Sequence, residues 1–185
     1  LHDIIETINA AYVNRKDSLK EIDKKRELVK DWHLDQKWVA TMLYVDLYAG
    51  NIKKRENHLP YLKELGINYV HLMPLLEQRE GQADGGYAVK NFRKVNAKLG
   101  NNNDLIALID KMHAEDQIVA IDFVMNHTAK EHEWAQSILK GESRFKDYYY
   151  LYPDRSIPDQ FERTLPEVFP DFAPGNFTYQ KEIGQ

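Results

Sequence analysis

The sequence predicts an α/β fold in which parallel strands alternate with helices. Three short apolar runs, at 39–45, 67–73 and 118–124, are typical of buried strands, and the stretches between them carry leucines at helical spacing. Neighbouring parallel strands need a crossover connection, which a helix supplies. The order strand, helix, strand, helix, strand therefore indicates a βαβαβ unit with right-handed crossovers up to about residue 128.

The first segment, residues 1–37, is expected to be a helical layer that packs and carries no chemistry. Apolar residues recur at helical spacing in two stretches, 1–13 and 18–30, and most of the residues between them are charged. Ser18 with Glu21 is a candidate capping box for the second helix.

The predicted sheet occupies residues 38–129. Between its first two strands, leucines at 59, 62 and 65 share one helical face, and Gly66 is well placed to end that helix. The polar, glycine-containing stretch 77–103 is expected to be a long loop. Asn103 is the candidate cap of the helix that precedes the third strand.

Residues 130–185 lack a clear period and are expected to form an irregular lobe inserted after the third strand. A short helix is predicted over 131–139, and five of the seven prolines lie between 153 and 174. Trp134 and the tyrosines at 148–150 are expected to pack this lobe. No internal repeat is present.

Composition excludes several classes of protein. The 185 residues carry 25 basic and 29 acidic side chains, a formal charge of -4 without a basic stripe, so nucleic acid is not an expected partner. The absence of cysteine excludes disulfides, thiolate metal sites and cysteine nucleophiles. No apolar run approaches the roughly 20 residues of a membrane span, and no export leader follows Leu1. We therefore expect an excised or processed cytoplasmic chain with no membrane partner.

Polar residues gather where the predicted strands end, and ligands bind at the carboxyl ends of parallel strands. Asp122 interrupts an apolar run, and a buried carboxylate is costly unless it is paired. Period-two spacing places Asn126 on the same side as Asp122, and His127 then begins the loop. Together they could bind several hydroxyl groups; the alternative is a structural aspartate that fixes the loop. Asp46 after the first strand has the same structural alternative.

The run 84–87 (Asp-Gly-Gly-Tyr) offers a second candidate site. Its glycines permit a tight turn or a close approach of a ligand. Tyr87 could stack on the apolar face of a sugar while Asp84 accepts a hydroxyl proton; the alternative is a surface turn. The remaining histidines lack metal-ligand spacing, so no metal site is predicted from them.

Taken together, these segments resemble the α-amylase superfamily of retaining (β/α)8-barrel enzymes. The run 122–127 (Asp-Phe-Val-Met-Asn-His) is similar to the first signature segment of that superfamily, at the end of its third barrel strand. Further similarity extends over strand one, helix one and strand two at 44–51, 59–67 and 72–75. Within the superfamily the amylosucrases are most similar, on the runs 84–89, 152–155, 165–171 and 174–177.

The resemblance implies strands one to three of a (β/α)8 barrel, a helical segment before them and a truncated inserted lobe after them. It also implies that Asp84, Tyr87 and His127 line the subsite for the glucosyl unit. Tyr87 would stack on the sugar ring, His127 would bind the 6-hydroxyl, and Asp122 would anchor the network beneath them.

The resemblance also bears on metal and acceptor binding. Asn126 matches a calcium ligand of many α-amylases, but amylosucrase-like members are not expected to use calcium there. Neither a metal nor another cofactor is therefore expected. Pro166 stands where amylosucrases can carry arginine, which bears on the choice of acceptor.

The implied activity is glucosyl transfer from sucrose or a related α-glucoside. Retaining chemistry needs a nucleophilic and an acidic carboxyl group about 5–5.5 Å apart. The superfamily places them after strands four and five, beyond Gln185, so no catalytic residue is expected within these 185 residues and this piece is expected to be inactive. A sugar-binding module, a structural half-domain, or part of a sucrose phosphorylase, trehalose synthase or α-glucosidase remain alternatives. An open three-stranded sheet is also expected to self-associate.

Overall fold

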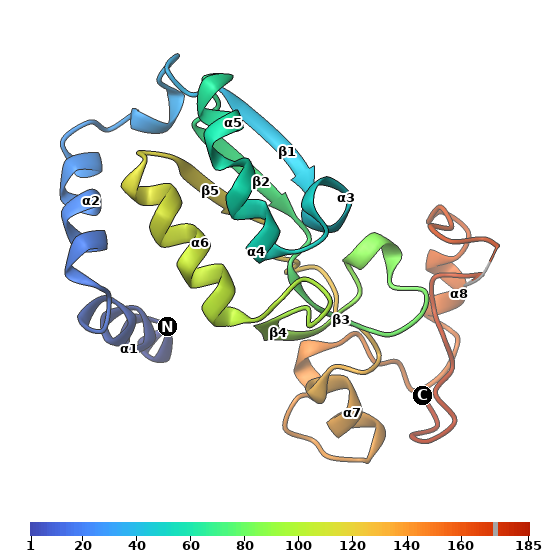
Figure 1. Ribbon diagram of the computed structural model, residues 1–185. Helices are drawn as coiled ribbons and strands as arrows, with labels where there is room; N and C mark the ends of the chain where they lie inside the picture. Colours follow the sequence, from blue (N-terminus) through green and yellow to red (C-terminus); the bar gives the residue numbers. More distant parts are fainter. Residues whose placement is uncertain (172–173) are drawn as a thin grey trace.

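A parallel three-stranded sheet forms the centre of the computed structural model, which describes residues 1–171 and 174–185 (Figure 1). The strands β1 (Ala40–Tyr44), β2 (Tyr69–Met73) and β5 (Ile118–Ile121) lie in the order β1-β2-β5. In the register, Tyr69 of β2 pairs with Ala40 of β1 and with Ile118 of β5. The predicted βαβαβ unit is therefore confirmed, although each strand is shorter than expected.

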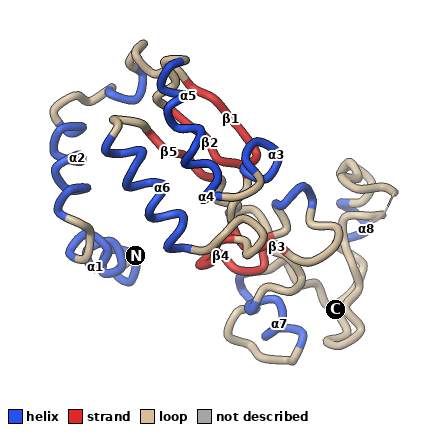
Figure 2. Tube along the Cα trace, in the orientation of Figure 1, coloured by secondary structure: helices blue, strands red, loops and turns tan. Residues whose placement is uncertain are grey.

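Helices cover one face of this sheet, as Figures 1 and 2 show. They are α4 (Ile52–Arg55), α5 (Leu59–Glu64) and α6 (Asn102–Ala114), while α3 (Val45–Ala49) lies at the carboxyl end of β1. The hydrophobic core lies between the helices and the sheet, where Val70 and Leu72 of β2 meet Leu62, Leu108 and Met112. Alternation along β2 turns these two residues into the core and leaves His71 on the opposite face.

The opposite face of the sheet is uncovered in this chain. Met42 pairs with His71 on this face and is 69% exposed. The outer strands β1 and β5 each pair with one neighbour among the described residues. The described residues therefore cover these strands on one face only, a correction to the expected buried strands.

The stretch 77–103 is not the expected long loop. It contributes to an antiparallel pair, β3 (Leu76–Gln78) and β4 (Val89–Val95), in which Leu76 pairs with Val95. Val89 and Val95 at the ends of β4 are buried, and the charged residues between them obscure the strand pattern in the sequence. The short 3-10 helix η3 (Asp84–Gly86) lies between the two strands.

Gly66 follows the end of α5 as predicted, but both predicted N-caps are wrong by two residues. Helix α2 (Asp17–Glu27) follows Lys16, whose backbone is extended, so Ser18 already lies within the helix and cannot cap it. Helix α6 is capped by Asn101, whose side chain accepts from the backbone N–H of Asp104 while the Asp104 carboxylate accepts from the Asn101 N–H.

Replacing the observed N-cap of α6 should lower the free energy of unfolding more than replacing the predicted one. Asn101→Ala removes the side-chain oxygen that accepts the backbone N–H groups of Asn103 and Asp104, and should lower the free energy of unfolding by about 1 kcal/mol. Asn103→Ala, inside the first turn, should have little effect and serves as the control. Urea unfolding of both variants measures the difference, and equal losses would contradict the assignment of Asn101 as the cap.

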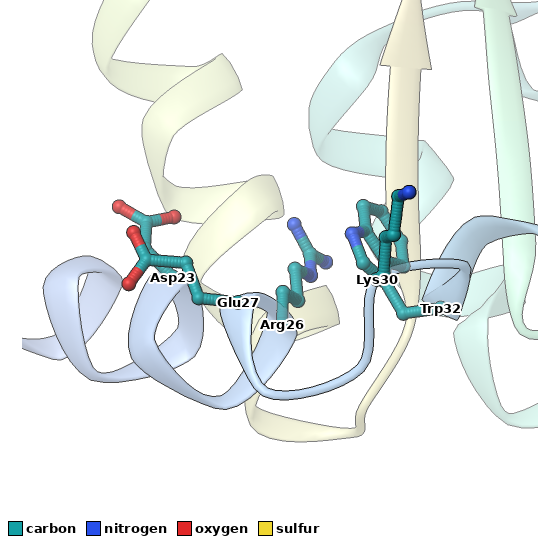
Figure 3. Close-up of a pocket in the computed structure, with 5 residues that line it drawn as sticks. All are labelled: Asp23, Arg26, Glu27, Lys30 and Trp32. Carbon is teal, nitrogen blue, oxygen red and sulfur yellow. The ribbon is translucent and has the colours of Figure 1, made fainter.

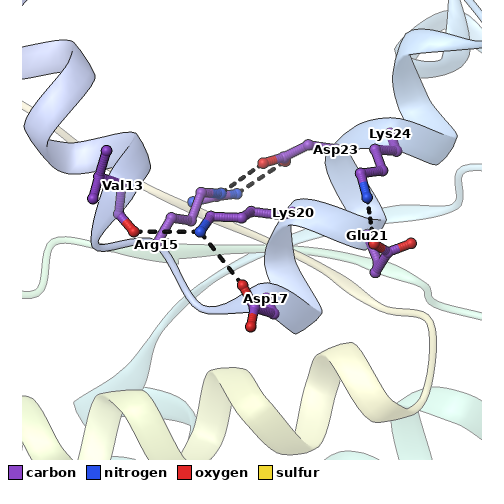
Figure 4. Close-up of polar contacts among 7 residues, drawn as sticks. All are labelled: Val13, Arg15, Asp17, Lys20, Glu21, Asp23 and Lys24. Carbon is purple, nitrogen blue, oxygen red and sulfur yellow. Dashed lines mark hydrogen bonds and ion pairs between the residues drawn. The ribbon is translucent and has the colours of Figure 1, made fainter.

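The N-terminal segment is the expected outer helical layer. Helices α1 (His2–Val13) and α2 contain no buried residue. Figure 4 shows the polar contacts of α2, including the two hydrogen bonds from Arg15 to Asp23 at 2.6 and 3.0 Å. Contact with Arg15 lowers the pKa of Asp23. Lys16 pairs with Asp110 of α6 at 2.8 Å, which joins this layer to the sheet segment.

A shallow pocket lies where the chain leaves α2 for the 3-10 helix η1 (Trp32–Leu34) (Figure 3). The Arg26 guanidinium lies 4.1 Å from the centre of the Trp32 ring, so the main contact there is a cation–π pair. The other residues that line the pocket are Asp23, Glu27 and Lys30. This composition supports a packing role.

The lobe after β5 contains the short helices α7 (Glu133–Leu139), η4 (Lys146–Tyr148) and α8 (Pro158–Phe161), joined by irregular segments. Trp134 stacks on Phe145 at 5.8 Å and meets Tyr148 edge-on at 4.9 Å. The predicted packing of Trp134 with Tyr148 is therefore confirmed, whereas Tyr150 is 92% exposed and its predicted packing is wrong. Positions 172 and 173 of the predicted lobe lie outside the described residues. None of the helices among those described is long and apolar enough to cross a bilayer.

Candidate functional site

Three side chains from separate parts of the chain meet at the carboxyl end of the sheet. His71 Nε2 lies 2.9 Å from Asp122 Oδ1, and the Tyr87 hydroxyl donates to Asp122 Oδ2 at 3.1 Å. The side chains of His71 and Asp122 are 26% and 23% exposed, so the carboxylate is partly withdrawn from water. Both of its oxygens have a partner, which meets the need of a half-buried carboxylate.

The sheet register brings His71 and Asp122 together. His71 pairs with Ala120 of β5, and Asp122 lies two residues beyond Ala120, just past the end of that strand. Diagonal positions on one face of neighbouring strands are within reach of long side chains. Asp122 therefore follows the third strand and does not lie inside it, a correction to the sequence-based expectation.

Two glycines place Tyr87 against this pair. Gly85 and Gly86 have φ values of 61° and 107°, a region that side chains rarely adopt. A Cβ on Gly86 would lie 2.4 Å from Pro74 Cγ and 2.7 Å from Gln78 Oε1. The chain thus passes close under Pro74 before it reaches Tyr87. The predicted tight turn is present, and the close approach at Gly86 is to Pro74; the predicted approach of a ligand stays a prediction.

The environment of Tyr87 keeps its phenol protonated. Burial raises the pKa of Tyr87 to about 12, and its hydrogen bond to the Asp122 carboxylate adds to the shift. An ionised phenol beside this carboxylate would place two negative charges in contact. Tyr87 is consequently a hydrogen-bond donor to Asp122 at neutral pH.

This shift has a measurable signature at alkaline pH. The phenolate absorbance of the wild type minus that of Tyr87→Phe should titrate at about pH 12, about two units above an ordinary tyrosine. Because the folded-state pKa is raised, its contribution to stability is complete below about pH 10 and is lost as the pH rises towards 12. Circular dichroism at each pH checks that the chain is folded. A difference midpoint near pH 10 in folded protein would contradict the contact.

The other two predicted site residues do not contact this trio. The Asp84 side chain is exposed and has no hydrogen-bond partner among the described residues. His127 is exposed, and its Nδ1 lies 3.3 Å from Asn126 Nδ2. The structure thus joins Tyr87 to Asp122, while the predicted substrate contacts of Asp84 and His127 stay predictions.

His71 is the residue that sequence reasoning missed. The sequence predicts no metal site at His71 and assigns it no other role. The position of His71 in the strand indicates its role. Side chains alternate between the two faces of a strand, so a polar residue between two apolar ones faces away from the core. The structure also gives Asp122 its two partners within the chain.

Asp46, the polar residue that follows β1, has a local structural role. Asp46 lies in the first turn of α3, where its Oδ1 accepts the backbone N–H of Leu47 at 2.9 Å. This contact supports the structural alternative for Asp46.

Among the described residues, one group with candidate metal ligands is found, His2, Asp3 and Glu6, all exposed on α1. It lies on a helix without buried residues and builds no site.

Comparison with known proteins adds the wider context. The family profile described as alpha amylase, catalytic domain, matches residues 16–181. The chain is 32% identical over 116 residues to an oligo-1,6-glucosidase of Heyndrickxia coagulans, which covers 60% of this chain and 20% of that protein. It is 32% identical over 112 residues to a 4-alpha-glucanotransferase of Thermotoga neapolitana, with coverage of 60% and 25%.

Solved structures show the same likeness. A family GH13_31 enzyme superposes with a TM-score of 0.59 at 29% identity, over 66% of this chain and 24% of that chain. An isomaltulose synthase from Erwinia rhapontici, in complex with sucrose, gives a TM-score of 0.55 at 26% identity, over 62% and 22%. The chain spans about a fifth to a quarter of the length of the curated relatives described above.

Proposed function

Because the chain belongs to the α-amylase family, we propose that it carries part of the glucosyl-binding site of a retaining enzyme that acts on α-glucosidic sugars. The matches confirm the fold class, an α/β fold that forms a partial (β/α)8 barrel. The contact of His71, Tyr87 and Asp122 at the carboxyl ends of β2 and β5 carries the proposal. Ligands of such barrels bind at that end of the strands.

The trio supports a specific division of tasks. Asp122 accepts hydrogen bonds through both carboxylate oxygens and fixes the orientation of its two partners. Tyr87, held at its hydroxyl, presents its ring for stacking on the apolar face of a glucosyl unit. His127, after Asp122 in the chain, is proposed to bind the 6-hydroxyl, and Asp84 is proposed to line the same subsite. No metal or cofactor is part of this proposal.

Covalent chemistry would need groups beyond those described above. A retaining enzyme forms and then hydrolyses or transfers a glycosyl intermediate with two carboxyl groups. The family resemblance places that pair after the fourth and fifth strands, whereas the sheet here has three. We therefore propose that these 185 residues bind an α-glucoside without turning it over.

Binding and turnover can be separated experimentally. Saturation-transfer NMR with methyl α-glucoside and sucrose should show contact with the 185-residue chain, and Tyr87→Ala should remove it. Tyr150→Ala, which removes an exposed tyrosine of the lobe, is the matched control. Release of glucose or fructose by the pure chain would overturn the proposed inactivity, and an unchanged signal in Tyr87→Ala would overturn the site.

The finer proposal is that the intact protein is amylosucrase-like. The similar proteins carry the names of glucosidases, synthases and glucanotransferases, so this proposal rests on the residues, above all the run 84–89 and the lobe segments. Product analysis of the full-length protein with sucrose tests it. Fructose release with growth of an α-glucan supports the proposal. Glucose 1-phosphate, a trehalose product or simple hydrolysis would instead indicate a sucrose phosphorylase, a trehalose synthase or an α-glucosidase.

A second proposal concerns association of the 185-residue chain. The uncovered sheet face exposes Met42, and the edge strand β5 exposes Ile121. Exposed edges and apolar patches promote pairing between chains. Sedimentation over a range of concentrations should show self-association, and Met42→Lys should weaken it. Val13→Lys, on the exposed helix α1, is the control. A stable compact monomer at all concentrations would contradict this proposal.

A further inference from the structure

Arg55 carries a buried charge that no described residue neutralises. It is the last residue of α4 and is 0% exposed. Its Nε and both terminal nitrogens are buried without a hydrogen-bond partner among the described residues. By contrast, Arg15, Arg79 and Arg155 each pair with a carboxylate.

This arrangement is costly for a group that stays ionised. A guanidinium has five N–H donors, no acceptor, and a charge that proteins do not remove. Burial of an ion without a partner costs several kcal/mol even after relaxation. The nearest carboxylate in sequence, Glu56, is paired with Lys111. Something other than an acidic side chain must therefore balance Arg55.

The neighbouring Tyr48 adds a second unpaired donor. The Arg55 guanidinium lies 5.5 Å from the centre of the Tyr48 ring, farther than the 4.1 Å between Arg26 and Trp32. The Tyr48 hydroxyl is also buried without a partner. His58 contacts the Tyr48 ring at 4.8 Å, which fixes the ring and leaves its hydroxyl free to donate.

We propose that Arg55, with Tyr48 beside it, binds a small inorganic anion of about halide size between α3 and α4. Complete burial of Arg55 excludes a macromolecular partner and favours a monatomic ion. A water molecule could accept from the N–H groups but would leave the positive charge uncompensated. An anion satisfies both requirements. This site is separate from the trio of His71, Tyr87 and Asp122.

The test is the effect of anion identity on unfolding. Urea unfolding of the wild type is compared in potassium chloride and potassium gluconate at equal ionic strength. Chloride should lower the unfolding equilibrium constant by about tenfold, as expected at a concentration about ten times the dissociation constant. Arg55→Met should abolish this difference. Arg15→Met, which removes a partly exposed arginine paired with Asp23, should retain it.

Each outcome decides the proposal. An equal unfolding constant for the wild type in the two salts would overturn it and assign the solvation of Arg55 to water. A chloride effect that persists in Arg55→Met would also overturn it. If Arg55→Met does not fold, Tyr48→Phe keeps the ring and removes the hydroxyl, and should reduce the chloride effect. Anomalous scattering from a bromide-soaked crystal gives an independent readout, with a peak expected beside Arg55 and its absence counting against the site.

Discussion

Gly86→Ala is expected to destabilise the chain by about 3 kcal/mol or more. The new Cβ would lie 2.4 Å from Pro74 Cγ, and the backbone φ of 107° is strained for any residue with a side chain. Pro74 is a rigid ring that cannot rotate away, so relief of the clash requires a shift of backbone. Because Gly86 precedes Tyr87, the same shift should also displace Tyr87 from Asp122.

The neighbouring glycine provides the matched control. Gly85 also has a positive φ, 61°, but a Cβ there would meet nothing closer than the Tyr44 hydroxyl at 3.8 Å. Gly85→Ala should therefore cost only the backbone strain, about 1 kcal/mol. Urea unfolding of both variants, followed by tryptophan fluorescence, measures the two losses. Similar losses in both variants would contradict the close approach of Gly86 to Pro74.

Asp122→Ala should abolish the α-glucoside contact proposed for this chain. The substitution removes the acceptor for both the Tyr87 hydroxyl and His71 Nε2. Hydrogen bonds to a charged group contribute about 1.5–3 kcal/mol each to folding, so loss of both should also lower the free energy of unfolding by about 3 kcal/mol or more. Tyr87 would also lose the contact that orients its ring.

Two companion variants separate this effect from general unfolding. Asp46→Ala removes an exposed aspartate just past β1, near the same end of the sheet, and should leave the sugar signal unchanged. Asp122→Asn keeps one acceptor oxygen and should retain part of the binding. Asp122→Ala should also lower the pH at which Tyr87 ionises, because the neighbouring negative charge is gone. Wild-type sugar contact in folded Asp122→Ala would rule out the proposed role of Asp122.

Local sequence pattern predicted the elements better than their ends. The three parallel strands follow from apolar β-branched runs, because such runs have few alternatives to a buried sheet. The predicted N-cap of α6 was wrong because Asn101 and Asn103 are chemically identical candidates. Only the backbone conformation decides which of them precedes the helix. The β3–β4 pair was missed because charged residues within β4 interrupt its apolar alternation.

The sequence by itself determined the βαβαβ order, the position of the glycine turn before Tyr87 and the importance of Asp122 as a carboxylate beside an apolar strand. Only the tertiary structure decided that His71 and Tyr87 are its partners. These residues lie 51 and 35 positions from Asp122 along the chain, and strand register and the Gly86–Pro74 approach bring them together. Local patterns specify which residues form an element, whereas contacts between distant residues depend on how the elements pack.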